Sequence, residues 1–168
     1  MSSEICPDCG VELPVGNALG HPYIGASPSC WELYSFLLTG TPPTAPTRFG
    51  ILLNDAYCVQ HHGVSTKPQA IQSVAIHLLT LHGVLGLNHD NSKWIRDRIL
   101  SKNYRNGFEW LTPPANNQAM NILQIVQGES PKERAVLLEQ YIKTVYNGWV
   151  EQHEATLENW WQQFVLTE

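Results

Sequence analysis

Residues 6–30 carry the side chains with the clearest chemical potential. Cys6 and Cys9 are separated by two residues and followed by Gly10, and His21 and Cys30 complete the pattern C-x2-C-x11-H-x8-C. Two cysteines at this spacing suit a turn that directs both thiolates to one point, and glycine tolerates the positive φ that such a turn needs. Zinc takes four sulfur or nitrogen ligands in a tetrahedron. The pattern therefore predicts a zinc site made by Cys6, Cys9, His21 and Cys30.

A redox pair and a chance surface pair are the alternatives for the two cysteines. A thioredoxin-type pair lies between a strand and a helix, and the helix N-terminus lowers the pKa of one thiol. No helical pattern opens in EICPDCGVELP, so the metal interpretation is favoured. Cys30 supports it, because it lies in the first turn of a predicted helix, where free N–H groups stabilise a thiolate. His21 could equally be a loop residue.

A second set of candidates lies on predicted helices: Asp55, His61, His77 and His153. His77 stands in the apolar segment SVAIHLL and His153 in a stripe of aromatic and aliphatic residues, so both rings are expected to face the interior. If two helices form an antiparallel hairpin through residues 62–67, Asp55 comes within reach of His77. The cluster could bind a catalytic metal or transfer protons. The alternative is a core histidine whose ring is satisfied by an acid or a carbonyl.

The elements that must position these residues are mainly helices. Residues 1–27 are rich in Gly and Pro, which leaves room only for turns or a small β-ribbon. Apolar residues at helical spacing predict helices over residues 28–39, 48–61, 68–87, 92–103, 117–126 and from 130 almost to the end. The third is apolar nearly all round and is expected to be central.

The sequence thus predicts an all-α fold, a four- to five-helix bundle with an irregular zinc-stapled N-terminal cap. The chain of 168 residues is 43% hydrophobic and 15% charged, enough for one packed core. We expect a single domain over residues 1–168, with the cap at 1–27 and the bundle at 28–168.

Charge and hydropathy limit the partners and the location. The net charge is −5 and no run of Lys or Arg occurs, which argues against binding to nucleic acid or to an anionic membrane. No signal-like segment and no run of about eighteen apolar residues is present, so a cytoplasmic location is expected. In that reducing compartment the four cysteines favour metal binding over disulfides. Cys58 has no basic residue beside it in sequence and is interpreted as a small buried side chain.

Several segments resemble an uncharacterised bacterial family of unknown function. They are CPDCG, HPYIGASPSCW, LLNDAYCVQHHG, QAIQSVAIHLL and WVEQHEATLENWW, and they span most of the chain. The family patterns CPxCG, HxY, SPxCW, DAYxxQHPG and QSxAxHL are similar to them, which implies a common fold and a shared site but no reaction. The implied site residues are Cys6, Cys9, His21, Cys30, Asp55, His61 and His77. This chain has His62 where the family pattern has proline.

Three functions from different classes follow. The favoured one is a helical protein with zinc as its cofactor, in which the zinc is structural and histidines line a pocket for a small ligand. The second is a metal-dependent hydrolase or thiol transferase, with Asp55, His61, His77 and His153 around a metal that keeps an open position. The third is a non-catalytic module whose cap offers HPYIGAS to a protein partner.

Overall fold

The computed structural model describes residues 2–39, 48–102, 104–115 and 120–167. Within these ranges the chain forms two short strands, six α-helices and two π-helical turns. They are β1 (Ser3–Ile5), β2 (Glu12–Pro14), α1 (Pro28–Thr39), α2 (Arg48–Gln60), α3 (Pro68–Leu81), η1 (His82–Gly86), α4 (Ser92–Leu100), α5 (Ile122–Val126), α6 (Pro131–Trp161) and η2 (Gln162–Leu166). The prediction of a mostly helical protein is confirmed, although the described residues hold six helices instead of four or five.

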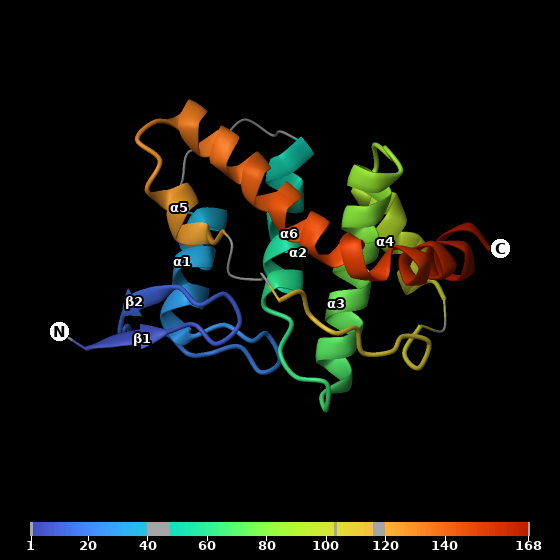
Figure 1. Ribbon diagram of the computed structural model, residues 1–168, viewed down its shortest axis with the longest axis horizontal. Helices are drawn as coiled ribbons and strands as arrows, with labels where there is room; N and C mark the ends of the chain where they lie inside the picture. The colour runs from blue at the N-terminus through green and yellow to red at the C-terminus, as the bar shows by residue number, and fades with distance from the viewer. Residues whose placement is uncertain (1, 40–47, 103, 116–119, 168) are drawn as a thin grey trace.

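The N-terminal segment forms the small β-ribbon that its Gly and Pro content allows. β1 and β2 are antiparallel, with Glu4 opposite Leu13. In Figure 1 this ribbon and α1 occupy one end of the molecule, α4 and the C-terminus occupy the other, and α6 runs across the length between them. α2 packs against both α3 and α6, and α5 packs against α6 and α1. Side chains of the N-terminal segment, Val11 and Ile24 among them, belong to the same hydrophobic core as the helices.

Capping residues in the sequence set the helix starts. The Ser27 hydroxyl accepts a hydrogen bond from the Cys30 N–H at 3.3 Å, so Ser27 is the N-cap of α1 and Pro28 occupies its first position. Ser130 caps α6 in the same way, through the N–H of Glu133 at 3.1 Å. Both starts agree with the sequence-based boundaries because local capping, and not distant packing, determines them.

A close backbone approach joins the N-terminal segment to the loop after α2. Gly63 has a φ of 70°, and a Cβ there would lie 2.3 Å from the Tyr23 carbonyl oxygen. Its N–H donates to the Asp8 carboxylate at 2.9 Å, and the Gly25 N–H donates to the His61 carbonyl at 3.1 Å. Only glycine fits position 63, since it needs both a left-handed backbone and no side chain. The end of α2 is thereby held against the segment that carries the two N-terminal cysteines.

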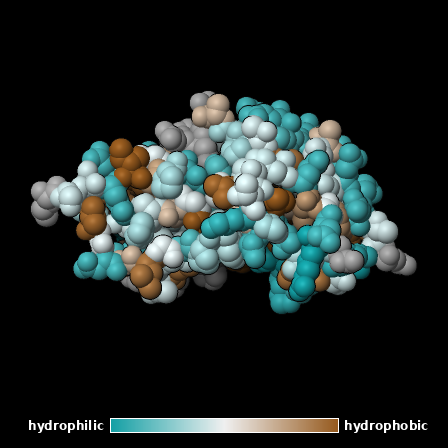
Figure 2. Space-filling view, turned by 90° about the horizontal axis from the view of Figure 1, so that it is seen from below, coloured by the Kyte–Doolittle hydropathy of each residue, from teal (hydrophilic) through white to brown (hydrophobic). Residues whose placement is uncertain are grey.

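The surface seen in Figure 2 is mixed. Hydrophobic side chains form separate patches between polar ones, and hydrophilic residues predominate toward the C-terminal end. Across the described ranges no helix combines the length and the apolar character needed to cross a bilayer.

Candidate metal centre

Four side chains that can ligate a metal meet where the N-terminal segment, α1 and the end of α2 come together. They are Cys6, Cys9, Cys30 and His61, and one ligand atom from each lies within 4.8 Å of all the others. Each of the four residues is at most 1% exposed. The group has the composition Cys3His, one of the sets that bind structural zinc in proteins.

Two separations within the group are close to the edges of a metal tetrahedron. The Sγ atoms of Cys9 and Cys30 are 3.9 Å apart, and the Sγ of Cys30 lies 3.4 Å from the Nε2 of His61. Ligands at the usual zinc bond lengths, about 2.3 Å for sulfur and about 2.0 Å for nitrogen, stand about 3.5 to 3.8 Å apart at the corners of a tetrahedron. The four donors, all within 4.8 Å of one another, are therefore close enough together that they could hold one such ion.

The orientation of His61 directs its Nε2 atom, which can bind a metal, toward the cysteines. Its Nδ1–H donates to the carbonyl oxygen of Tyr57, one turn earlier, at 2.9 Å. With the proton fixed on Nδ1, the lone pair of the neutral ring is on Nε2, which faces Cys30. The Tyr57 ring also packs against the His61 ring at 4.0 Å between centroids. The last turn of α2 thus fixes both the tautomer and the direction of this side chain.

The cysteine turn has the geometry that its sequence predicts. The Gly10 N–H donates to the Cys6 carbonyl at 2.9 Å, the Cys6 N–H donates to the Val11 carbonyl at 2.8 Å, and Gly10 has a φ of 71°. The sulfur atoms also accept hydrogen bonds, from the Ser27 N–H to Cys6 at 3.5 Å and from the Tyr57 hydroxyl to Cys30 at 3.4 Å. Such donors stabilise thiolate charge in a buried site.

The close packing of these side chains shifts the pKa values of Cys6, Cys9 and His61. Hydrogen bonds with Cys30 and Cys9 hold the pKa of Cys6 well below its usual range, and hydrogen bonds with Cys30 and Cys6 raise the pKa of Cys9. Burial lowers the pKa of His61, but hydrogen bonds and charge from Cys30 and Cys6 outweigh it and raise the pKa to about 10. In the metal-free group, protons on the neighbouring side chains therefore balance the negative charge of a thiolate. A metal ion would replace those protons.

The structure corrects the expected fourth ligand. His61 completes the group with the three cysteines, and His21 is not part of it. The Nδ1 of His21 accepts hydrogen bonds from the N–H groups of Ile24 at 3.1 Å and Tyr23 at 3.4 Å, and its ring packs against Trp31. His21 therefore shapes the loop before α1. It is near the cysteines in sequence, but the hydrogen bonds of its own loop occupy its ring.

The structure places the second predicted set, Asp55, His61, His77 and His153, at three separate positions. Asp55 and His77 do meet, with Oδ1 and Nδ1 2.7 Å apart, as the antiparallel hairpin of α2 and α3 requires. His61 lies in the metal group instead, so its assignment to this set is wrong. His153 is half-buried on α6, where its Nε2–H donates to the Thr112 carbonyl at 2.8 Å. The ring nitrogens of His61 and His153 therefore contact other groups than the Asp55–His77 pair.

One further residue belongs beside Asp55 and His77. Arg96 on α4 donates from Nη1 to both carboxylate oxygens of Asp55, at 3.1 and 2.9 Å. The Cys58 thiol, on the same helix as Asp55, donates to the side-chain oxygen of Asn54 at 3.8 Å. No spacing in the sequence indicates Arg96.

His82 lies in a separate cavity. The cavity has a volume of about 430 Å³ and is also lined by Glu158 and Gln162. The Nδ1 of His82 is 3.0 Å from the Tyr146 hydroxyl, while its buried Nε2 has no hydrogen-bond partner among the described residues. Burial lowers the pKa of His82, so the ring is neutral at physiological pH.

The fold and the site define the chain as a helical protein with a group of three cysteines and one histidine that could hold a metal. Its sequence matches the model of a family of unknown function, DUF5946, over residues 4–150, and the chain belongs to that family. The resemblance to an uncharacterised family is thereby confirmed. Neither the curated proteins nor the solved structures yield a match.

Proposed function

We propose that this protein binds one zinc ion through Cys6, Cys9, Cys30 and His61, and that the ion is structural. The observation that carries the proposal is the convergence of four buried soft donors within 4.8 Å of one another. Three thiolates and one imidazole in a tetrahedral arrangement favour zinc over magnesium or calcium, which prefer oxygen ligands.

The burial of the group favours a structural role over a catalytic one. A catalytic zinc keeps one position for water or substrate, whereas a structural zinc has four protein ligands and is closed to solvent. Here all four corners are protein side chains, and none is more than 1% exposed. The alternative, a metal-dependent hydrolase or thiol transferase, needs Asp55, His61, His77 and His153 around one ion. Those residues do not share a site, so the structural zinc is the function that we carry forward.

The ion would join three parts of the chain that are far apart in sequence. Cys6 and Cys9 lie in the N-terminal segment, Cys30 is in the first turn of α1, and His61 follows the last residue of α2. The ribbon is too short to hold such a segment by itself, since isolated two-stranded ribbons are marginal in water. The zinc therefore fixes the N-terminal segment onto the helices. We expect a cytoplasmic location, where thiolate ligands stay reduced.

Metal analysis of the purified protein tests this proposal. We expect about one zinc per chain by elemental analysis, and intact mass spectrometry under native conditions should show the same stoichiometry. Cys6→Ser and Cys30→Ser should lose most of the zinc. Cys58→Ser is the matched control, because Cys58 is the remaining cysteine and lies outside the group. A folded protein without metal, or unchanged zinc in Cys30→Ser, would show that the proposal is wrong.

A further inference from the structure

A cavity outside the metal group lies between η1 and the junction of α6 with η2. Its volume is about 430 Å³. The lining residues are His82, Leu87, Glu158, Asn159, Trp161 and Gln162. Pockets for small molecules have volumes of about 300 to 1,000 Å³, and an apolar cavity of about 150 Å³ is enough for benzene. This cavity is therefore large enough for an aromatic ring with a short side chain.

His82 brings an unpaired polar atom to this cavity. The residue is only 4% exposed, and its Nδ1 lies 3.0 Å from the hydroxyl of Tyr146, which is not part of the lining. Its Nε2 is buried and has no hydrogen-bond partner in the part of the chain that the structure describes. A buried polar atom without a partner is unfavourable, so a ligand group that bonds to it gains free energy that solvent-exposed groups do not offer.

The sequence HGVLG, which forms η1, fixes which nitrogen of His82 is occupied. A Cβ at Gly86 would overlap the Tyr146 hydroxyl oxygen and lie 3.1 Å from the Nδ1 of His82. A side chain at this position would therefore push Tyr146 and His82 apart. The turn is also π-helical, and π-helical turns at the end of or within α-helices are frequent at functional sites.

The fixed charge at the cavity is negative. Among the described residues that line it, Glu158 is the only charged one. Neither Glu158 nor Glu154, one turn earlier on α6, forms an ion pair with a lysine or arginine of the described ranges. Burial lowers the pKa of His82, and the charges of Glu158 and Glu154 act in the opposite direction, so their field reaches the ring. Because burial has the larger effect, His82 is neutral at physiological pH and does not repel a cation.

We propose that this cavity binds a small organic cation, a primary ammonium group on an apolar body. An ammonium group has three N–H donors and no acceptor. The polar groups of the lining can all accept: the Glu158 carboxylate, the side-chain carbonyls of Asn159 and Gln162, and the Nε2 lone pair of His82 when its Nδ1–H donates to Tyr146. An anion would be repelled by Glu158. The inference is independent of the zinc proposal, because none of these residues belongs to the metal group.

Trp161 and Leu87 supply the apolar part of the site. The Trp161 ring lies 6.3 Å from the His82 ring between centroids, and also 6.3 Å from the His89 ring. The face of a tryptophan attracts cations more strongly than that of any other side chain. Leu87 is 45% exposed, so the body of a ligand can cover apolar surface that is now in water. The site thus combines an aromatic face, an aliphatic contact and a carboxylate.

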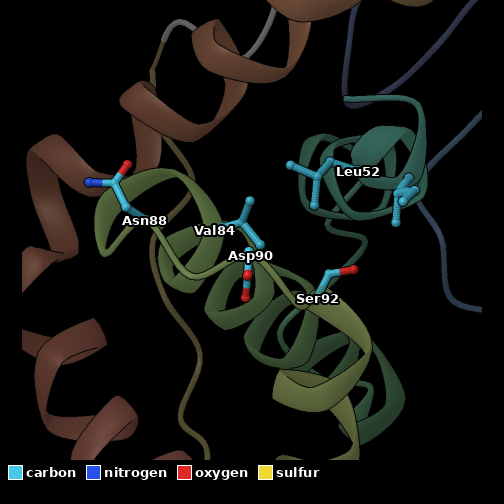
Figure 3. A pocket seen from close by; sticks show the side chains of 6 residues that line it. Leu52, Val84, Asn88, Asp90 and Ser92 are labelled. Carbon is cyan, nitrogen blue, oxygen red and sulfur yellow. The ribbon is translucent and has the colours of Figure 1, made fainter. Parts of the chain in front are cut away.

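A second cavity provides an internal comparison. It has a volume of about 260 Å³ and lies between α2, η1 and the start of α4, where Figure 3 shows Leu52, Val84 and Ser92 around it. Asp90 gives it one carboxylate. No buried polar atom without a partner belongs to the described residues of its lining. It therefore shares the negative charge of the larger cavity but lacks both the unpaired imidazole nitrogen and the tryptophan.

Titration of the full chain as purified with 2-phenylethylamine at about pH 7 tests the proposal. Like the side chain of lysine, this amine is protonated at that pH, and 2-phenylethanol has the same body without the charge. We expect the dissociation constant of the ammonium to be about threefold to tenfold lower than that of the alcohol, the effect of one partly exposed ion pair and one cation–π contact. Equal constants for the two probes, or no binding of the amine up to about 10 mM, would overturn the proposal.

Two variants and one resonance identify the cavity that is occupied. Glu158→Gln should weaken binding of the amine about threefold to tenfold and leave that of the alcohol within about twofold, since only the charge is lost. Asp90→Asn is the matched control, because it removes the same charge from the smaller cavity. With histidines labelled with nitrogen-15, the amine should shift the Nε2 resonance of His82, which gains a hydrogen bond. If Asp90→Asn weakens binding in place of Glu158→Gln, or if the His82 resonance does not move, the proposal is wrong.

Discussion

Replacing His61 distinguishes the two candidates for the fourth metal ligand. A structural zinc contributes about 10 to 16 kcal/mol of apparent binding free energy, so an equal share for each of four ligands is about 2.5 to 4 kcal/mol. His61 is fully buried and directed at Cys30 by the Tyr57 carbonyl, so it should contribute its whole share. His61→Gln is therefore expected to weaken zinc binding about a hundredfold to a thousandfold, at about 1.4 kcal/mol per tenfold.

The same substitution at His21 should have little effect on zinc. The His21 ring nitrogen that faces the protein accepts two backbone hydrogen bonds, at 3.1 and 3.4 Å, and the residue lies outside the metal group. His21→Gln is expected to change the zinc dissociation constant by less than about threefold, within the effect of local loop adjustment.

Competition with a chromophoric zinc chelator measures both constants on the purified variants. Circular dichroism on each variant shows whether its helices are intact, so that a loss of zinc is not mistaken for a loss of fold. The reasoning is refuted if His21→Gln releases zinc as readily as His61→Gln, or if His61→Gln binds zinc as tightly as the parent chain.

Three further predictions follow from the contacts. Removal of the metal by a chelator should expose the backbone amides of residues 2–27 and of Gly63 to hydrogen exchange, while most of the far-ultraviolet helical signal remains. Collapse of that signal would contradict a local role for the metal. Asp55→Ala should lower the free energy of unfolding by about 3 to 5 kcal/mol in urea titrations, because it leaves Arg96 and His77 without their buried anion; a loss below about 1 kcal/mol would contradict this. The folded pKa of His77 is raised from 6.5 to about 10, so its contribution to stability is complete below pH 6.5 and disappears as the pH rises through about 10. The difference in unfolding free energy between the parent chain and His77→Gln should shrink as the pH rises over that range in saturating zinc. A difference that grows with pH would show that folding lowers the pKa of His77 instead of raising it.

The sequence by itself determined most of the helices and part of the metal group. Helix starts at Pro28, Pro68 and Pro131 were predictable because a capping serine or an N-terminal proline acts within one turn. Apolar spacing located the body of each helix for the same local reason. The pair Cys6 and Cys9 was recognisable since two residues and a glycine suffice to close their turn.

Tertiary structure decided the partners that lie far apart along the chain. His61 reaches the cysteines only because α2 ends against the N-terminal segment, a contact that depends on Gly63 and Asp8. Ligand spacing within one segment pointed to His21, because sequence distance cannot show that local hydrogen bonds already occupy its ring. In the same way, no spacing in the sequence pairs Arg96 with Asp55, yet the packing of α4 on α3 brings the guanidinium to that carboxylate. Local structure follows from short-range sterics and hydrogen bonds, whereas these sites depend on which helix faces meet when the core forms.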